Sequence, residues 1–479
     1  MTILEQLRLL VNLTFCACIA LCVLWASRRP LGRKHARTSD LPFFLTCWFI
    51  PLYWLLLLLD VFSRPPGDLL ADAAFSLCVQ FAGLLSLYYL LLLVLLPLLR
   101  RWVLPQTCAL LWLLPVCLYF LRHSVKAAPR LVLEAPDLPV GPLLLLWLAG
   151  SAGVLGWKIF SHLRFRRWLL AEARPVEDDA VLALWWQLNK ELAPDRTECY
   201  PLVCSPRAKS PLSVGLWSIR VVLPERDYPP DQLALILKHE LTHILRRDSV
   251  SKFCLTFCTA LCWFNPLMWL AMSRSAQDME LSCDEAVLTD ADPQTRRAYA
   301  GLLLDTAGDA RGFTSCLSAS ASALRYRLKR VVRPARRLAG SLLTGCLLFG
   351  LLWAYGSVAL AYETRSCADL LFAGQPEACA LRSASLSAEG EGASLNGQAV
   401  LDYLAGLEAR KITGGYTFAH VSPRLELCYD GPDFSRTVIL AGDYLICRPR
   451  SNTSAQQEVY LVSGGVDWDL LTGLPEAAS

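Results

Sequence analysis

The stretch His239-Glu240-Leu241-Thr242-His243 decides how this sequence of 479 residues is interpreted. On an α-helix, residues four apart lie on one face, so His239 and His243 can direct their imidazoles at one ion. Upstream, Pro229-Pro230-Asp231 predicts the start of such a helix. Neutral imidazole is a good zinc ligand, and the stretch therefore predicts a zinc site on this helix.

The carboxylate next to the first histidine predicts hydrolytic chemistry. Zn²⁺ lowers the pKa of a bound water to about 7, so Glu240 can accept its proton as the water attacks a peptide carbonyl. The chain has only six histidines, and a chance H-E-x-x-H is therefore rare, on the order of a few per thousand. A catalytic zinc site needs a third protein ligand and keeps one position for water.

The third ligand is expected on a second helix. Glu280 and Asp284 are four residues apart and so share a helix face. One carboxylate can bind zinc while the other accepts a hydrogen bond from a ligand histidine. Glu285 and Asp278 are weaker alternatives for the ligand, and the carboxylates could also be ordinary solvated charges. Cys283 suits zinc chemically but is interpreted as a packing residue, because it lies off the carboxylate face.

Three motifs in this order resemble the BlaR/MecR-type family of membrane-embedded regulatory metallopeptidases. They are the run 239–248, then Trp263-Phe264-Asn265-Pro266, then Glu280-x-x-Cys283-Asp284, and the resemblance extends over roughly residues 1–340. It implies a thermolysin-like (gluzincin-like) zinc metalloendopeptidase, with these roles: His239, His243 and Glu280 as zinc ligands, Glu240 as the general base, and Asp284 as the residue that orients a histidine. It also implies that Ser213–Leu223 forms an edge strand that holds a substrate by strand addition.

The composition predicts a membrane protein. Hydrophobic residues make up 54% of the chain and charged residues only 18%. A membrane span needs about 20 apolar residues, and six such runs occur, at 7–26, 43–62, 75–99, 103–121, 140–160 and 338–360. The net charge of +4 is too small to indicate a nucleic-acid partner.

The distribution of Arg and Lys around these runs sets the expected topology. By the positive-inside rule, the N-terminus is outside, residues 161–337 are cytoplasmic, and the tail is outside again. We therefore expect a multi-pass α-helical protein of a bacterial plasma membrane, in contact with lipid. Its expected parts are an N-terminal transmembrane region of about five helices (1–160), a cytoplasmic α+β peptidase domain (161–337), a final transmembrane helix (338–361), and a small extracytoplasmic α+β or β-rich domain (362–479).

One more apolar run, 253–272, conflicts with a simple count of spans. If it crossed the membrane, His239 and Glu280 would lie on opposite sides and could not share an ion. We therefore expect it to re-enter, to lie at the interface, or to be buried against other helices, with a break at Asn265-Pro266.

Most of the 19 cysteines lie in apolar runs, where cysteine acts as a small hydrophobic residue. Three of them, spaced by four along the run 253–272, are expected to serve close packing rather than metal or redox chemistry: Cys254, Cys258 and Cys262. Four cysteines follow the last apolar run. We expect Cys428 to pair with Cys447 across a sheet, and Cys367 to pair with Cys379 in a short loop.

The tail contains three short strand-like runs, at 425–429, 437–440 and 459–462. The penicillin receptors of the resembling family carry an outer domain acylated on the serine of an S-x-x-K motif. The tail has one lysine, Lys411, and the residue three positions before it is Glu408. We therefore expect an extracytoplasmic ligand that does not act by β-lactam acylation.

Together these features predict a signalling peptidase. Its substrate would be a cytoplasmic protein, expected to be a transcriptional repressor, or the chain itself. The basic segment Ala321–Arg337 would link the peptidase to the last span and is a candidate for self-cleavage. Two alternatives remain open, a housekeeping peptidase that degrades misfolded membrane proteins and a proteolytically silent receptor. The sequence also leaves open the signal and the oligomeric state, a homodimer included.

Overall fold

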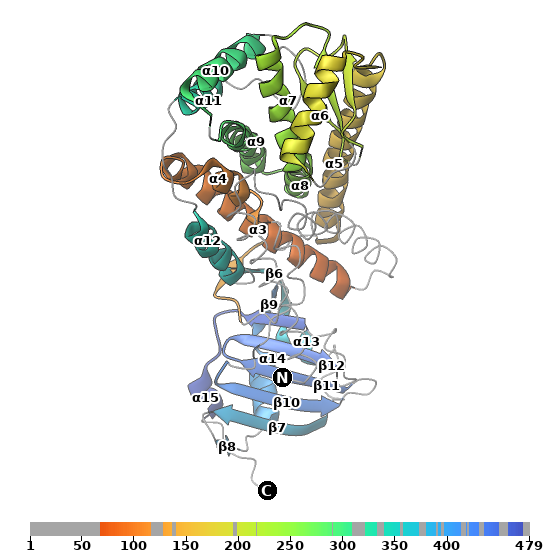
Figure 1. The fold of residues 1–479 in the computed structure, drawn as a ribbon. Coiled ribbons are helices and arrows are strands. Elements are labelled where there is room, and N and C mark those ends of the chain that lie inside the picture. Colours follow the sequence, from red (N-terminus) through yellow and green to blue (C-terminus); the bar gives the residue numbers. More distant parts are fainter. Residues whose placement is uncertain are drawn as a thin grey trace.

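The computed structural model describes most of the chain between Asp68 and Thr472. The described residues are 68–115, 128–136, 140–194, 199–216, 218–289, 291–308, 321–332, 340–354, 358–372, 380–388, 391–393, 397–412, 418, 421–430, 435–449 and 458–472. The spans expected at 7–26 and 43–62 lie outside these residues. Figure 1 shows a helical part with a small sheet above, the helices α3, α4 and α12 in the middle, and a large sheet below.

Two described helices are long and apolar enough to cross a membrane. They are α3 (Asp68–Leu99), in its segment Ala82–Leu99, and α5 (Val140–Leu170), in its segment Pro142–Leu170. At 1.5 Å per residue, α5 is about 46 Å long, which exceeds the roughly 30 Å of a hydrocarbon core. Both helices agree with the spans expected at 75–99 and 140–160, although α5 continues ten residues beyond its expected end.

The spans expected at 103–121 and 338–360 differ from the structure. In the described part of the first, α4 (Pro105–Leu111) has only seven residues and is followed by a turn. In the second, α12 (Ser341–Ala354) has 14 residues, and strand β6 begins at Val358. Helices of these lengths reach about 10 and 21 Å, short of a full crossing. The apolar residues of α4 pack against α9 instead, so the prediction of one long helix is wrong for residues 103–115.

The run 253–272 is broken as expected. Helix α8 (Asp248–Leu261) ends before the predicted break at Asn265-Pro266, and α9 (Pro266–Val287) begins at that break. The Asn265 side chain accepts a hydrogen bond from the Leu267 N–H (2.9 Å) and so caps α9. Three cysteines of this region are buried in one apolar cluster with residues of α3 and α4, which confirms their packing role: Cys254, Cys258 and Cys262.

The region expected to form the peptidase, residues 161–337, contains a four-stranded sheet of order β2-β3-β5-β4. Its strands are β2 (Arg174–Pro175), β3 (Leu202–Ser205), β4 (Leu212–Val214) and β5 (Arg220–Pro224). Gly215, with φ +117°, begins the reversal between β4 and β5; a Cβ there would lie 2.3 Å from the Ser218 carbonyl oxygen. Strand β4 is at the edge of the sheet, which agrees with the first half of the expected edge strand Ser213–Leu223, whereas β5 is an interior strand.

One apolar core joins this sheet to the helices around it. These helices are α6 (Asp179–Leu192), α7 (Pro230–Leu245), α9, α10 (Pro293–Gly308) and α11 (Ala321–Val332). Trp185 of α6, Val221 of β5 and Leu237 of α7 are among its buried members. The expected α+β character of residues 161–337 is confirmed for their described part, and α7 packs against both the sheet and α9.

The tail folds around a nine-stranded sheet of order β1-β6-β9-β13-β12-β11-β10-β7-β8. The strands not yet bounded are β1 (Leu131–Glu134), β6 (Val358–Ser366), β7 (Ala380–Ala388), β8 (Glu391–Ala393), β9 (Glu408–Ile412), β10 (Arg424–Asp430), β11 (Ser435–Ala441), β12 (Tyr444–Pro449) and β13 (Glu458–Val462). Three helices complete it, α13 (Cys367–Phe372), α14 (Gly397–Ala405) and α15 (Trp468–Thr472). All three strand-like runs expected in the tail are strands.

The sheet of the tail also contains a strand from far earlier in the chain. Strand β1, which precedes α5, pairs in parallel with β6. The pairing continues with a hydrogen bond from the Ala135 N–H to the Ala361 carbonyl (2.8 Å), and Arg410 contacts the Glu134 carboxylate (3.2 Å). The segment before α5 and the tail therefore belong to one sheet.

The expected disulfide between Cys428 and Cys447 is wrong. Both are free thiols, and β11 lies between their strands: Cys428 faces Thr437, and Cys447 faces Val438. Strands two positions apart are about 9.5 Å apart, beyond the roughly 7 Å that a disulfide can bridge. Because successive residues alternate between faces, the two thiols also lie on opposite faces of the sheet. Cys367 is a free buried thiol, and its expected partner Cys379 lies outside the described residues.

Candidate metal centre

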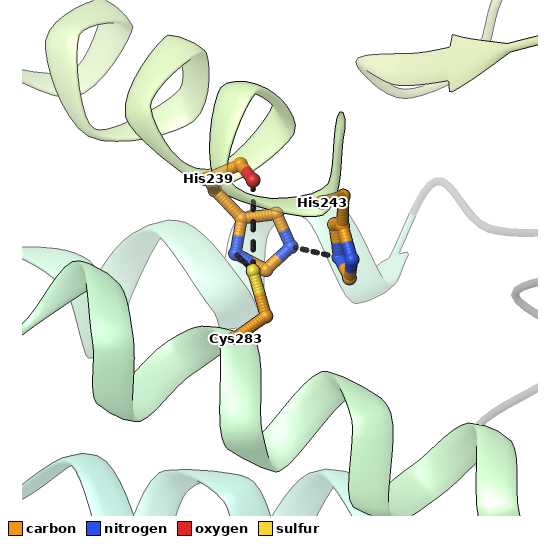
Figure 2. Close-up of side chains that lie close together, drawn as sticks. All are labelled: His239, His243 and Cys283. Atoms are coloured by element: carbon orange, nitrogen blue, oxygen red, sulfur yellow. Dashed lines mark hydrogen bonds between the residues drawn. The ribbon is translucent and has the colours of Figure 1, made fainter. Parts of the chain in front are cut away.

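Helix α7 begins at the predicted prolines and carries both histidines and the glutamate between them. The Nε2 atoms of His239 and His243 lie 3.1 Å apart, and the two rings are nearly perpendicular, at 86°. Figure 2 shows the two imidazoles facing one another, with Cys283 reaching them from the neighbouring helix. The predicted pair is thus brought together on one face of the helix.

The other ring nitrogen of each histidine is held by a partner. Nδ1 of His243 lies 2.6 Å from Oδ2 of Asp248. Nδ1 of His239 lies 2.8 Å from the Tyr299 hydroxyl, which itself donates to Oδ1 of Asp284 (2.7 Å). Since that hydroxyl has one hydrogen and gives it to Asp284, it accepts from His239. In the neutral form, both rings therefore carry their proton on Nδ1.

This arrangement points two Nε2 lone pairs at each other across 3.1 Å. Two lone pairs at that distance repel unless a cation or a proton lies between them. The geometry is the one that a metal ion needs, with Nε2 free to bind and Nδ1 fixed by an acceptor. The residues present therefore fit a zinc ion.

Glu280 of α9 supplies an oxygen to the same place. Its Oε2 lies 3.7 Å from Nε2 of His239, and its Oε1 lies 3.6 Å from Nε2 of His243. A tetrahedral zinc site with ligands at 2.0–2.1 Å places ligand atoms about 3.4 Å apart. The three separations among the predicted ligands are close to this value. The alternative Asp278 is bound elsewhere, by Arg100 and by Trp112 Nε1 at 2.8 Å.

Cys283 offers a second donor set. It is fully buried in the apolar core, as its predicted packing role requires. Its sulfur also lies 3.5 Å from Nδ1 of His239, a contact that the sequence did not predict, and together with both histidines it forms a group within 4.8 Å that could hold a metal ion. Burial raises the pKa of this thiol, but His239 and His243 outweigh it and hold the pKa below its ordinary value. Both N,N,O and N,N,S sets suit zinc.

The electrostatics of the site favour a positive charge between the histidines. Burial lowers the pKa of His239, but Cys283 and Glu280 outweigh it and raise that pKa to about 10. Burial raises the pKa of Glu280, whereas His243, His239 and Arg327 bring it well below its ordinary value, so this carboxylate is ionised at neutral pH. A divalent cation would satisfy the same imbalance.

Glu240, the predicted base, follows His239 in α7 and is buried, with 8% of its surface exposed. Within the described part of the chain, its carboxylate makes no hydrogen bond or ion pair. A carboxylate without a protein partner remains available to accept a proton from water.

Three residues around the site were not predicted as part of it. Asp248 is five residues beyond His243, and a left-handed turn at Arg247 (φ 55°) returns it to the histidine. Tyr299 stands between His239 and Asp284, so Asp284 is connected to the histidine ring through this hydroxyl. The direct separation of Nδ1 of His239 and Oδ1 of Asp284 is 3.7 Å. The third is Arg327, which contacts two carboxylates of α9.

Comparison with known proteins agrees with the site. Residues 124–331 match the family described as "BlaR1 peptidase M56". The chain is also similar to "Regulatory protein BlaR1" of Bacillus licheniformis, with 27% identity over 191 residues. That match covers 39% of this chain and 31% of the relative, so the chain spans about a third of the length of the curated relative it matches. All residues of the candidate metal centre lie inside the family match, and the tail lies outside it.

Proposed function

We propose, from the match of residues 124–331 to the BlaR1 peptidase M56 family, that the chain is a membrane-embedded zinc metalloendopeptidase of a signalling type. The observation that carries the proposal is the pair of Nε2 atoms 3.1 Å apart, each on a ring whose Nδ1 is already engaged. Such a pair is suited to hold a catalytic metal ion.

In this proposal His239, His243 and Glu280 hold the ion, and the fourth position stays open. A bound zinc would supply a Lewis acid and lower the pKa of water to about 7. Glu240 would accept a proton from the attacking water and return it to the leaving amine of the cleaved peptide. The ring orientations are kept by Asp248 on one histidine and by the Tyr299 hydroxyl on the other.

The proposed substrate is a protein segment in extended conformation. Strand β4 (Leu212–Val214) is an edge strand and contacts α7, the helix with both histidines. A peptide that adds to this edge would gain main-chain hydrogen bonds and run past the metal centre. We propose that the segment belongs to a cytoplasmic transcriptional repressor or to the chain itself.

We propose that the tail senses an extracytoplasmic ligand. Its features do not support acylation by a β-lactam. Lys411 is a buried residue of β9 and lies 3.5 Å from the Glu458 carboxylate. The residue three positions before Lys411 is Glu408, where an S-x-x-K motif has a serine. A ligand can alter the metal centre only if it binds two states of the protein with different affinities.

The test compares three proteins in bacterial cells, the full chain, the Glu240→Gln variant and a chain without residues 363–479. Immunoblots and quantitative proteomics would follow fragments of this chain and of cytoplasmic proteins. We expect cleavage fragments that are absent in the Glu240→Gln variant. We also expect their rate of formation to change when the tail is removed. Equal rates with and without the tail under every condition would favour a housekeeping peptidase, and no Glu240-dependent fragment would favour a silent receptor.

A second measurement addresses the ligand alone. Incubation of the full chain with a fluorescent penicillin is expected to leave it unlabelled, because the tail lacks the S-x-x-K pair. Stable labelling of the tail would contradict the proposal.

A further inference from the structure

Helix α11 reaches the metal centre through one side chain. The Arg327 guanidinium donates from Nε to Oδ2 of Asp284 (2.7 Å) and from Nη2 to Oδ1 of Asp284 (2.8 Å). The same Nη2 lies 3.5 Å from Oε2 of Glu280. This two-pronged contact fixes the plane of the carboxylate as well as its distance.

We propose that Arg327 is a positioning residue that holds the ligand set of the metal centre and connects it to α11. The proposal rests on the proposed function, because it concerns the same site. Arg327 acts on two of the three ligands: it contacts Glu280 directly, and it reaches His239 through Asp284 and the Tyr299 hydroxyl.

The contact of Arg327 with the two carboxylates lies in a largely buried part of the site. The side chains of Asp284, Arg327 and Glu280 are 4%, 16% and 20% exposed. At such sites water replaces a missing partner poorly, so withdrawal of the guanidinium leaves a buried carboxylate uncompensated. The Asp284 carboxylate would then turn toward another donor, and the Tyr299 hydroxyl and the His239 ring would lose their fixed orientation.

A second arginine attaches the same helix to the residue that follows α3. Arg330 lies one turn beyond Arg327, and its Nη2 donates to the Arg100 carbonyl. Arg100 in turn binds Asp278 of α9 through two hydrogen bonds of 2.8 Å. Helix α11 is thus held to α9 at two points, directly by Arg327 and indirectly by Arg330.

Helix α11 lies between the candidate metal centre and the tail along the chain. Helix α11 ends at Val332, and α12, which leads into strand β6 of the tail, begins at Ser341. A displacement of α11 relative to α9 would withdraw Arg327 from Asp284 and Glu280. Helix α11 is therefore one element through which a change in the tail would reach the proposed zinc ligands.

The test measures zinc retention by the purified full chain in detergent, which does not depend on proteolysis. Arg327→Gln is compared with Arg325→Gln, a matched variant of an exposed arginine on the same helix. Zinc transfer to a colorimetric chelator is expected to show 10- to 100-fold weaker binding in Arg327→Gln, the usual effect of losing a residue that orients a metal ligand. Arg325→Gln is expected to match the unaltered chain.

Two further variants separate positioning from general destabilisation. Arg327→Lys keeps the positive charge but loses the two parallel N–H donors of the guanidinium. It is expected to change the visible spectrum of the cobalt-substituted protein, whereas Arg325→Lys is expected to leave that spectrum unchanged. Asp284→Asn combined with Arg327→Gln is expected to weaken zinc binding no more than either change alone. Unchanged zinc affinity in Arg327→Gln, or an unchanged cobalt spectrum in Arg327→Lys, would overturn the inference and leave the proposed function standing. A full chain that holds no zinc at all would instead refute the proposed function.

Discussion

Oδ2 of Asp248 lies 2.6 Å from Nδ1 of His243, across a turn in which Arg247 adopts φ 55°. Burial raises the pKa of Asp248, but Arg246, His243 and Lys252 outweigh it and lower the pKa. The carboxylate is therefore ionised at neutral pH and keeps the histidine proton on Nδ1, so that Nε2 faces the metal position.

Asp248→Asn is expected to weaken zinc binding by 10- to 100-fold, because an amide holds the histidine tautomer less firmly than a carboxylate. Competition with a chelator measures the change. Asp231→Asn, an exposed change in the first turn of α7, serves as the control and should have no effect. Equal affinities in both variants would show that the short contact does not support the metal.

The proposed ligands and base have distinct expected phenotypes. The purified full chain should contain about one zinc ion, because one set of three ligands is assembled. Glu240→Gln should keep the metal and lose peptidase activity, whereas His243→Ala and Glu280→Ala should lose both. Elemental analysis and a cleavage assay check this, and a Glu280→Ala protein with full zinc occupancy would remove Glu280 from the ligand set.

Cys283 and Glu280 can be distinguished by spectroscopy. With Co²⁺ in place of zinc, a thiolate ligand gives a near-ultraviolet charge-transfer band, and an N,N,O ligand set gives none. We expect no such band, and Cys283→Ser should keep about one zinc ion per chain. A band that disappears in Cys283→Ser would assign the sulfur as a ligand.

The buried thiols of the tail should resist alkylation. Burial raises the pKa of Cys367 to about 11 and that of Cys447 to about 12, so both remain protonated at pH 8, where the thiolate is the reactive form. Both pKa values lie above that of a thiol in the unfolded chain, about 8.5. The contribution of these protonated thiols to the stability of the folded tail is therefore complete below about pH 8.5 and is lost as the pH rises toward 11–12.

Mass spectrometry after brief alkylation of the native chain checks this. The half-buried Cys428 is the internal control and should react before the other two. Thiol-reactive labelling of all three in denaturant is also expected, since none of them is in a disulfide. Recovery of a Cys428–Cys447 peptide pair would contradict the strand register.

The expected topology can be tested at sites that the structure places. An epitope inserted at the exposed turn residue Asp443 and one inserted at Arg130, just before β1, should be accessible from the same side of the membrane, because β1 and β6 share a sheet. An epitope at Tyr200 should be accessible from the cytoplasm. Opposite accessibility of the first two sites would be incompatible with the sheet.

The sequence predicted those contacts of the candidate metal centre that depend on local spacing. The histidines and Glu280 follow from helical periodicity on two helices, and Asn265-Pro266 marked the break that lets these helices meet. Asp248 was missed because its position depends on a left-handed residue that is not a glycine, a conformation that composition does not reveal. Tyr299 is 60 residues from His239 along the chain, and Arg327 is 43 residues from Asp284. Only tertiary packing brings these partners together, so local spacing could not predict the contacts.

Hydrophobicity alone was less informative about spans. The residues around α4 are as apolar as those of a membrane helix, but their partners are the side chains of α9. Burial in protein and burial in lipid demand the same composition, so the sequence could not distinguish a short packed helix from a long span. The disulfide prediction failed for a related reason, since the order of strands in a sheet is not the order in the chain.

The strand contributed by Leu131–Glu134 restricts how the tail can move. A domain tethered through one point can tumble freely, whereas one fixed at two points keeps only rotation about the line that joins them. The tail has two such points, its own connection from α12 and the sheet pairing that leads straight into α5. At its far end, α5 meets the peptidase sheet, where the Ser205 hydroxyl donates to the Leu169 carbonyl (2.8 Å). Any hinge motion of the tail must therefore tilt or twist a helix whose other end is bound to the sheet beside the candidate metal centre.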